Sequence, residues 1–398
     1  MRSLFIIIVI SFFVSTNSYS QPIQLSDSAQ VSLLTNYPWN KEIYALFGHT
    51  AIRVQDPVHD IDYAFNYGIF DFSSSNFTYR FSKGETDYMV FPFPFIKYIE
   101  EYDDRQVITV EQILNLNQVE KQSIWDALVI NSLPENRVYR YNYFFDNCST
   151  RPRDIVEQNI SGTIIYPSTG KQQTFRDLIR EYTSLSPWSE FGIDMVIGSG
   201  AERVATDREK MFLPLYLENA YDGAVIKDKD GSERKLVAYD QLLTDYPLNK
   251  KASGIFTPLV TGCILFALSL VISYFTLRRR FLLGGKIFDT VLFVVAGMAG
   301  IIIAFLTLFS EHPYVDSNWN IIWLNPLQLI AATLFFVKSL SKYVYCYHFI
   351  NFALLSLFLL FWGLIPQQLE IAFIPFILSL WIRSGTNFVE YKSMKQRN

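Results

Sequence analysis

Residues 144–151 read Phe-Phe-Asp-Asn-Cys-Ser-Thr-Arg, and this segment decides how the chain is interpreted. The aromatic-rich residues 138–145 predict a β-strand, and residues 152–159 predict a helix that a hydroxyl side chain just before it would cap. Cys148 therefore lies between a strand and a helix N-terminus, where backbone amides and the helix dipole stabilise a thiolate and an oxyanion. The alternative, a buried inert thiol, fits the polar residues around it poorly. Cys148 is our candidate nucleophile.

A second polar residue that packing does not explain is His49, within residues 47–53, Phe-Gly-His-Thr-Ala-Ile-Arg. An imidazole near a thiol removes its proton or holds it as an ion pair. His59 is the other histidine before residue 254, but it belongs to a polar turn and is the less favoured base. Because side chains on one strand face alternate, Asp62 and Asn66 share a face, and we expect one of them to orient the base, Asp62 before Asn66.

The N-terminus predicts export. Residues 1–20 combine an early arginine, a short apolar run and small residues at a cleavage site, which is typical of a signal peptide; an uncleaved anchor is the alternative. Residues 21–254 are then outside the cytoplasm, and Cys148 is the only cysteine among them, so no intramolecular disulfide is expected there. The formal charge of −4 argues against a nucleic-acid partner.

The composition changes near residue 254, beyond which apolar segments predict a membrane bundle. We expect five spans, with four as the alternative because the third contains a proline and the fifth is short. The expected spans are 255–277, 287–309, 321–337, 343–364 and 369–382.

The charges flanking these spans predict their orientation. One side would carry ten lysines and arginines, and the short connections on the other side only two. This excess predicts a cytoplasmic C-terminus and an odd number of spans, with a transmembrane domain over 255–383 and a cytoplasmic tail over 384–398. The ten are Arg278, Arg279, Arg280, Lys286, Lys338, Lys342, Arg383, Lys392, Lys395 and Arg397, and the two are Lys250 and Lys251.

The exported domain mixes strand and helix periodicity. Residues 51–54 and 61–67 alternate as half-buried strands do, and residues 119–131 have a helical pattern. We therefore expect an α+β domain. The order of histidine, polar strand residue and cysteine at a helix start resembles circularly permuted papain-like thiol enzymes. Asn147-Cys148 resembles the nucleophile motif of the lecithin–retinol acyltransferase group, whose members move acyl chains from phospholipids through a thioester.

A longer resemblance covers roughly residues 30–330. Its motifs are similar to those of the Lnb family, the lipoprotein N-acyltransferases of Bacteroidota, which combine a periplasmic thiol domain with membrane helices. They are Gly-His-Thr-Ala-Ile-Arg at 48–53, Phe-Asn-Tyr-Gly at 65–68, Asp-Asn-Cys-Ser-Thr at 146–150, Phe-Leu-Pro at 212–214, and the loop from His312-Pro313 to Asn325-Pro326.

The resemblance implies a two-step transfer. Cys148, activated by His49, would take an acyl chain from a membrane phospholipid, and the α-amine of a lipoprotein's diacylglyceryl-cysteine would accept it as an amide. No cofactor or metal is implied, and the chain contains neither a phosphate-binding glycine loop nor a metal-ligand spacing. Nothing in the sequence addresses the oligomeric state.

Five further residues are candidates for substrate binding. Arginines beside the catalytic motifs suit a lipid phosphate, although ordinary salt bridges explain them equally well. A histidine in the loop between spans two and three would bind head groups or close the site from below, unless it is simply a polar interface residue. The candidates are Arg53, Asn147, Arg151, Arg153 and His312.

Two other functions compete with acyl transfer. The same thiol would serve a membrane-anchored periplasmic cysteine peptidase or amidase that acts on cell-wall peptides. A non-catalytic binding module is the third interpretation. Five spans exceed what an anchor requires, which favours a substrate drawn from the bilayer.

Overall fold

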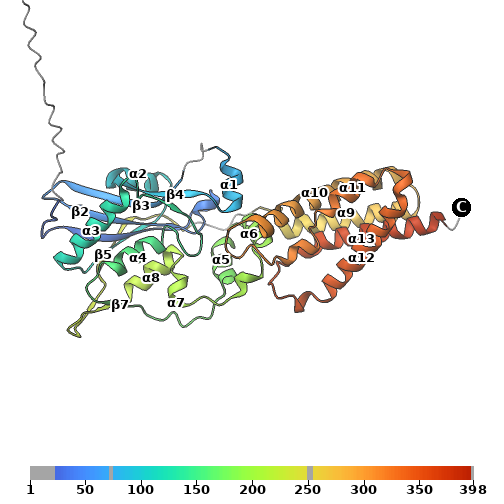
Figure 1. The fold of residues 1–398 in the computed structure, drawn as a ribbon. Helices are drawn as coiled ribbons and strands as arrows, with labels where there is room; N and C mark the ends of the chain where they lie inside the picture. The colour runs from blue at the N-terminus through green and yellow to red at the C-terminus, as the bar shows by residue number, and fades with distance from the viewer. Residues whose placement is uncertain (1–22, 71–74, 249–253, 396–398) are drawn as a thin grey trace, which may run out of the picture.

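The computed structural model describes residues 23–70, 75–248 and 254–395, so the expected signal peptide, 1–20, lies outside the described residues. An α/β unit occupies one end of an elongated molecule and a helical bundle the other (Figure 1). The last strand of the first unit ends at Thr244, and the first long apolar helix begins at Pro258. The change in composition near residue 254 therefore marks the passage from one unit to the other.

The α/β unit is built on a seven-stranded sheet in which every neighbouring pair is antiparallel. Its order is β10 (Val237–Thr244), β5 (Thr109–Leu114), β1 (Gln30–Asn36), β2 (His49–Asp56), β3 (Ile61–Ile69), β4 (Asp87–Pro94) and β6 (Val138–Arg140). A small second sheet has the order β7 (Thr163–Ile165), β8 (Val225–Lys227) and β9 (Glu233–Lys235).

The strands predicted at 51–54 and 61–67 lie within β2 and β3, but they are covered on both faces rather than one. On one face, Ile52 and Phe65 join a core that includes Trp125 of the helix α3 (Gln118–Ser132). On the other, Ala51 packs in a cluster with Tyr98 of the helix α2 (Phe95–Asp104). Because helices cover both faces, these strands are almost wholly buried.

The remaining helices of this unit lie between and after the strands. They are α1 (Phe77–Lys83), α4 (Thr150–Gln158), α5 (Phe175–Thr183), α6 (Pro187–Val196), α7 (Asp207–Lys210) and α8 (Pro214–Asp222). The helix predicted at 119–131 corresponds to α3. Asn117 and Glu120 form a capping box at its N-terminus.

The strand predicted over 138–145 ends early, at Arg140. The reason is a tight turn: the N–H and C=O groups of Asn142 and Asp146 bond to each other in both directions, at 2.9 Å. The Asn142 side chain also accepts from the N–H groups of Phe144 and Phe145. Because of this turn, the backbone leaves the sheet after Arg140 and reaches Cys148 directly after the turn.

The C-terminal part contains the helices α9 (Pro258–Leu277), α10 (Leu282–Phe309), α11 (Leu327–Leu334), α12 (Ser341–Leu360) and α13 (Phe373–Lys395). Among the described residues, three segments are long and apolar enough to cross a membrane: Pro258–Leu277, Leu282–Phe309 and Lys338–Leu360.

The third expected span, 321–337, is interrupted. Its helical part, α11, has eight residues and rises about 12 Å, far less than the thickness of a bilayer's hydrocarbon core. Within 369–382, α13 begins at Phe373 and continues without a break beyond Arg383. The structure also places Arg383 inside the bundle, fully buried and 2.6 Å from Asp289 of α10. Arg383 is therefore not a loop charge, and nine basic residues remain for the orientation argument.

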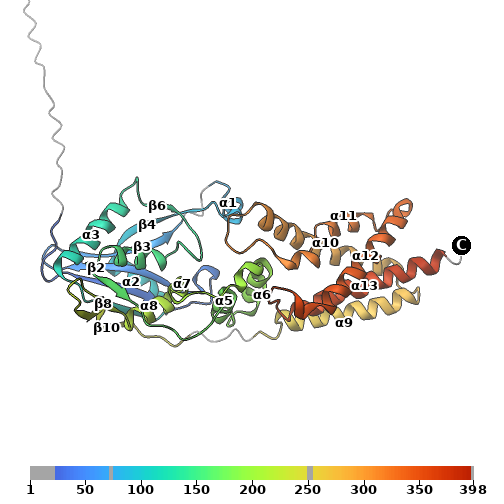
Figure 2. The ribbon, with the colours of Figure 1, turned by 60° about the horizontal axis from the view of Figure 1, so that its bottom comes forward.

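The α/β unit is packed directly on the bundle. Phe191 of α6 belongs to the hydrophobic core of the helices, with its ring centroid 4.9 Å from that of Phe373. The amide of Gln367 donates to the carbonyl of Ile197 at 3.0 Å. A second junction joins α1 to α10, and the N–H of Glu311 donates to the carbonyl of Lys83 at 2.8 Å (Figure 2). Two separate contacts thus fix the orientation of the sheet relative to the membrane helices.

Candidate active site

His49 is the first residue of β2, and its position depends on the glycine before it. Gly48 has φ +81°, and a Cβ there would lie 2.6 Å from the carbonyl oxygen of Asn36 on the neighbouring strand. Only glycine therefore fits this close approach without a shift of the backbone. The turn delivers His49 to the end of the sheet that faces the membrane helices, because β3 ends at the same edge and leads to α1.

Cys148 lies beside His49, although 99 positions separate them in the sequence. Gly68, near the end of β3, shows how close they are. A Cβ placed on Gly68 would be 3.7 Å from the Cβ of Cys148 and 3.8 Å from the Cε1 of His49. The hydroxyl of Thr50 also donates to the carbonyl of Cys148 at 2.5 Å. The strands β2 and β3 thus hold the thiol against the imidazole.

Asn66 orients the imidazole. Its Oδ1 atom lies 2.5 Å from Nε2 of His49, and an amide oxygen only accepts hydrogen bonds, so Nε2 carries the proton. The other ring nitrogen, Nδ1, is left for the thiol. Asp62, our first choice for this role, does not contact His49; its carboxylate pairs with Arg53 at 2.7 Å. The structure therefore places the second choice, Asn66, at the base.

The two side chains perturb each other's protonation. Burial acts to raise the pKa of Cys148, but the charge and hydrogen bond of His49 and the main chain of Thr50 outweigh burial and lower this pKa below its ordinary value. Burial acts to lower the pKa of His49, but the sulfur of Cys148, the amide of Asn66 and the charge of Glu101 raise it. The site therefore favours a thiolate–imidazolium ion pair.

Asn147 builds the turn that presents the nucleophile. Its side-chain oxygen accepts from the N–H groups of Ser149 and Thr150 at 2.8 and 2.9 Å. Its side-chain nitrogen donates to the carbonyls of Tyr143 and Phe212, both at 2.8 Å. The expected position of Cys148 at the start of α4 is confirmed, and a hydroxyl residue, Ser149, is the N-cap residue as predicted. The side chain that accepts from the first helix amides, however, is that of Asn147.

Two consequences follow from these bonds. The first two amides of the helix start are used by Asn147, so they are not the oxyanion donors that we expected. In addition, Asn147 is only 3% exposed. It therefore supports the backbone around Cys148 and is not available for the substrate binding that we expected.

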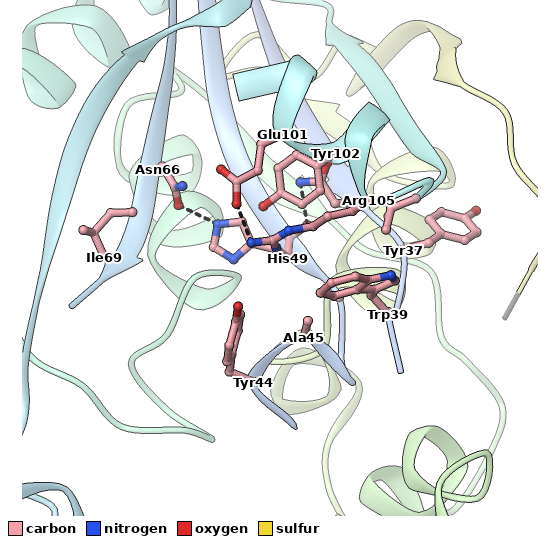
Figure 3. A pocket seen from close by; sticks show the side chains of 13 residues that line it. Tyr37, Trp39, Tyr44, Ala45, His49, Asn66, Ile69, Glu101, Tyr102 and Arg105 are labelled. Carbon is pink, nitrogen blue, oxygen red and sulfur yellow. Dashed lines mark hydrogen bonds and ion pairs between the residues drawn. The ribbon is translucent and has the colours of Figure 1, made fainter. Parts of the chain in front are cut away.

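A cavity of about 130 Å³ opens beside His49. Asn66 and Glu101 line it, and aromatic residues that include Trp39 and Tyr44 enclose it (Figure 3). The carboxylate of Glu101 is bonded to Arg105 at 2.6 Å, within α2 and its C-terminal end. The base is therefore in contact with a space large enough for part of a small substrate.

Three arginines were expected to bind a lipid phosphate, and all three are engaged by carboxylates. Arg53 is 7% exposed and bonds to Asp62 and Glu111 at 2.7 and 3.0 Å. Arg153 is buried, with a nitrogen 2.7 Å from an Asp154 oxygen.

Arg151 is held in a similar way. It bonds to Asp146 at 2.5 Å, and its guanidinium carbon lies 3.9 Å from the ring centroid of Tyr139. These three side chains brace the two catalytic motifs, and their geometry does not support contact with a phosphate.

The two other histidines of interest lie away from the thiol. His59 is at the opposite end of β2 from His49 and contacts Asp56 at 2.8 Å. His312, expected to close the site from below, contacts α1: its Nε2 atom lies 2.6 Å from the carbonyl oxygen of Phe81. The structure thus makes His312 part of the junction between α1 and the bundle.

Glu190, Asp194 and Glu370 bring carboxylate oxygens within 4.8 Å of one another at the base of the α/β unit. The two oxygens of Asp194 accept from Arg176 and Arg180, at 2.7 and 2.8 Å. These arginines neutralise the buried carboxylate, and Arg180 also donates to the carbonyl of Gln368 in the bundle at 2.8 Å. We therefore interpret the group as part of the contact between the two units.

Glu101 and Arg105 were not among the predicted site residues. Both belong to an ordinary charged stretch, Glu-Glu-Tyr-Asp-Asp-Arg at 100–105, whose pattern resembles a solvated helix face. Only the packing of α2 over β3 and β4 brings Glu101 near the base. No local signal in the sequence distinguishes it from Glu100.

Two family models match the chain. One describes the Lnb N-terminal periplasmic domain and matches residues 18–181; the other describes the Lnb transmembrane domain and matches residues 250–394. Neither the curated proteins nor the solved structures contained a match. The periplasmic match includes both His49 and Cys148, and the second covers the bundle on which their domain is packed. The chain belongs to the Lnb family, with an N-terminal periplasmic domain followed by a transmembrane domain.

Proposed function

We propose that this protein is a lipoprotein N-acyltransferase that uses Cys148 as its nucleophile. The observation that carries the proposal is the position of Cys148 beside His49, which Asn66 orients, at the edge of the periplasmic domain that faces the transmembrane helices. We also propose that the domain is a permuted papain-like fold of the lecithin–retinol acyltransferase type, since histidine precedes cysteine and the cysteine begins a helix.

In the first step, the thiolate of Cys148 attacks the ester carbonyl of a membrane phospholipid. The C–S bond forms and the C–O bond of the ester breaks. The departing alkoxide takes the proton that His49 holds at Nδ1, so a lysophospholipid leaves. The products of this step are a thioester on Cys148 and a neutral His49.

In the second step, the α-amine of a lipoprotein's diacylglyceryl-cysteine attacks the thioester carbonyl. The C–N bond forms, neutral His49 accepts a proton from the attacking nitrogen, and the thiolate leaves. The ion pair is restored and the product is an amide. Amide formation from a thioester is downhill, and the scheme uses no cofactor or metal.

Exposed apolar side chains beside the site suit a lipid donor. On α1, Tyr79 is 56% and Phe81 46% exposed, and the ring of Tyr79 lies 5.9 Å from that of Phe305 in the membrane helix α10. Tyr44, at the mouth of the cavity, is 54% exposed. An acyl chain leaving the bilayer along α10 would therefore meet apolar surface up to the site.

We further propose that the protein resides in the bacterial inner membrane with its C-terminus in the cytoplasm. The excess of basic residues supports this orientation, nine against two after Arg383 is set aside. The number of spans that this orientation requires is odd.

Mass spectrometry of lipoprotein N-termini tests the proposed function. The strain would lack this gene and any second N-acyltransferase, and it would be complemented with wild type or Cys148→Ala. We expect the amide-linked acyl group to disappear without the protein and to return only with wild type. Unchanged N-acylation in the deletion strain would contradict the proposal and favour a peptidase or amidase.

A further inference from the structure

The cavity beside His49 is lined by a carboxylate. Glu101 is the only acidic residue among the described residues that line it. Its carboxylate points into the cavity toward His49 and Arg105 (Figure 3). The carboxylate helps to keep His49 charged. Half of the Glu101 side chain is exposed, so the carboxylate also faces any ligand that enters the cavity.

The remaining walls of the cavity are aromatic and polar. Trp39, Tyr44 and Tyr102 supply rings, and Asn66 supplies an amide. Aromatic faces together with a carboxylate are a typical environment for an organic cation. Arg105 is one such cation. Its guanidinium lies 5.2 Å from the ring of Trp39 and 5.7 Å from that of Tyr102, and it bonds to Glu101.

We propose that this cavity is the acceptor site and that Glu101 binds the α-ammonium group of the incoming lipoprotein. The inference rests on the proposed function, because it assigns the second substrate of the same site. A carboxylate accepts about four hydrogen bonds, so the bond from Arg105 leaves capacity for an ammonium group. Arg105 fixes the direction of the carboxylate, and the exposed half of the Glu101 side chain receives the ligand.

The bound amine must lose one proton before it can act as a nucleophile. An ammonium group cannot attack, so one proton passes to solvent at the open side of the cavity. The neutral amine then attacks the thioester on Cys148, and His49 takes its second proton as the C–N bond forms and the C–S bond breaks. One proton is released to solvent per amide formed, and the ion pair of Cys148 and His49 is restored.

The test separates the two half-reactions in the purified full-length protein. The variant is Glu101→Gln, and the matched control is Glu100→Gln on the same helix, where Glu100 bonds to Lys97 and both side chains are more than half exposed. A phospholipid first loads Cys148, and intact mass measures the acyl-enzyme. A synthetic diacylglyceryl-cysteinyl peptide with a free amine is then the acceptor. Hydroxylamine, a small nucleophile uncharged at neutral pH, is the second acceptor.

Glu101 also raises the pKa of His49, so the variants are compared after acylation is complete. We expect the Glu101→Gln acyl-enzyme to react with hydroxylamine at a rate within about threefold of wild type. For the peptide, we expect KM to rise by about tenfold or more, the loss typical of a charge-assisted contact. Glu100→Gln should match wild type in every assay. An unchanged peptide KM in Glu101→Gln, or an equal loss with hydroxylamine, would overturn the acceptor-site proposal. If wild type never forms an acyl-enzyme on Cys148, the proposed function itself is wrong.

Discussion

The Nε2 atom of His49 and the Oδ1 atom of Asn66 lie 2.5 Å apart on the neighbouring strands β2 and β3. This contact sets the tautomer of the base and directs Nδ1 to Cys148. It also fixes the plane of the ring relative to a nucleophile that comes from a distant helix start. Because both strands are buried, neither residue can rotate away without loss of packing. Asn66 is thus a positioning residue for the base.

Removal of the Asn66 amide should slow acyl-enzyme formation. Asn66→Ala loses the oxygen that accepts from Nε2 of His49. The imidazole will then populate the tautomer with its proton on Nδ1, and the pKa of His49 will fall. We expect the rate of Cys148 acylation to fall by about tenfold to a hundredfold. Rapid quench and intact mass would measure it.

Asp62→Asn is the comparison for this variant. It weakens the ion pair with Arg53 and leaves His49 untouched, so the acylation rate should stay within about threefold of wild type. If Asp62→Asn slowed acylation as much as Asn66→Ala, the assignment of Asn66 would be wrong.

The reactivity of Cys148 should extend to low pH. The thiolate is the reactive form, and His49 lowers the pKa of Cys148. Iodoacetamide should therefore alkylate Cys148 at a lower pH than an ordinary thiol, and the rate should decline as the pH falls through the lowered pKa. Mass spectrometry of the alkylated peptide over a pH series would measure this profile.

His49→Ala is the control for the pH profile. Without the imidazolium, burial alone acts on the thiol and raises its pKa. The alkylation profile should shift toward alkaline pH. Identical profiles for wild type and His49→Ala would show that no ion pair forms.

Asn147 should matter for stability more than for binding. Asn147→Ala leaves the N–H groups of Ser149 and Thr150 and two carbonyls without their partner in a buried turn. We expect a loss of about 2–4 kcal/mol, measured as a lower Tm of the detergent-solubilised protein.

Asn147→Asp tests separately the hydrogen bonds that the Asn147 side chain accepts and those that it donates. It keeps the acceptor for the helix amides but loses the donor to Tyr143 and Phe212. An intermediate Tm is expected. A wild-type Tm for Asn147→Ala would contradict the structural role that we assign.

The local features of the chain could be predicted from the sequence. The polar residues around Cys148 in 144–151 indicated a thiol at a helix start, and the apolar runs indicated membrane helices; both are present in the structure. The motifs around His49 and Cys148 also identified the family. These features depend on neighbours within a few positions, on capping and on composition, so the sequence carries them directly.

The partner of the base was decided by strand register. Asp62 and Asn66 share a face, but Asp62 pairs with Gln55 and Asn66 with Ala51. Gln55 is six residues beyond His49, which places Asp62 roughly 20 Å from the base. Period-two alternation specifies the face of a strand and not the position along it. Only the pairing of β2 with β3 makes Asn66 the neighbour.

Glu101 and the engagement of the arginines also depended on tertiary structure. Glu101 reaches the cavity because α2 packs across the sheet, and Arg53 is unavailable because Glu111 comes from β5. Such contacts join residues that are far apart in the chain. The sequence around a charged residue does not show which residue it will pair with. The sequence by itself predicted the candidate nucleophile, the candidate base and, of the five expected spans, the three that are long and apolar enough in the described residues to cross a membrane. The fold decided which side chains surround them, because register and packing are set by the whole hydrophobic core.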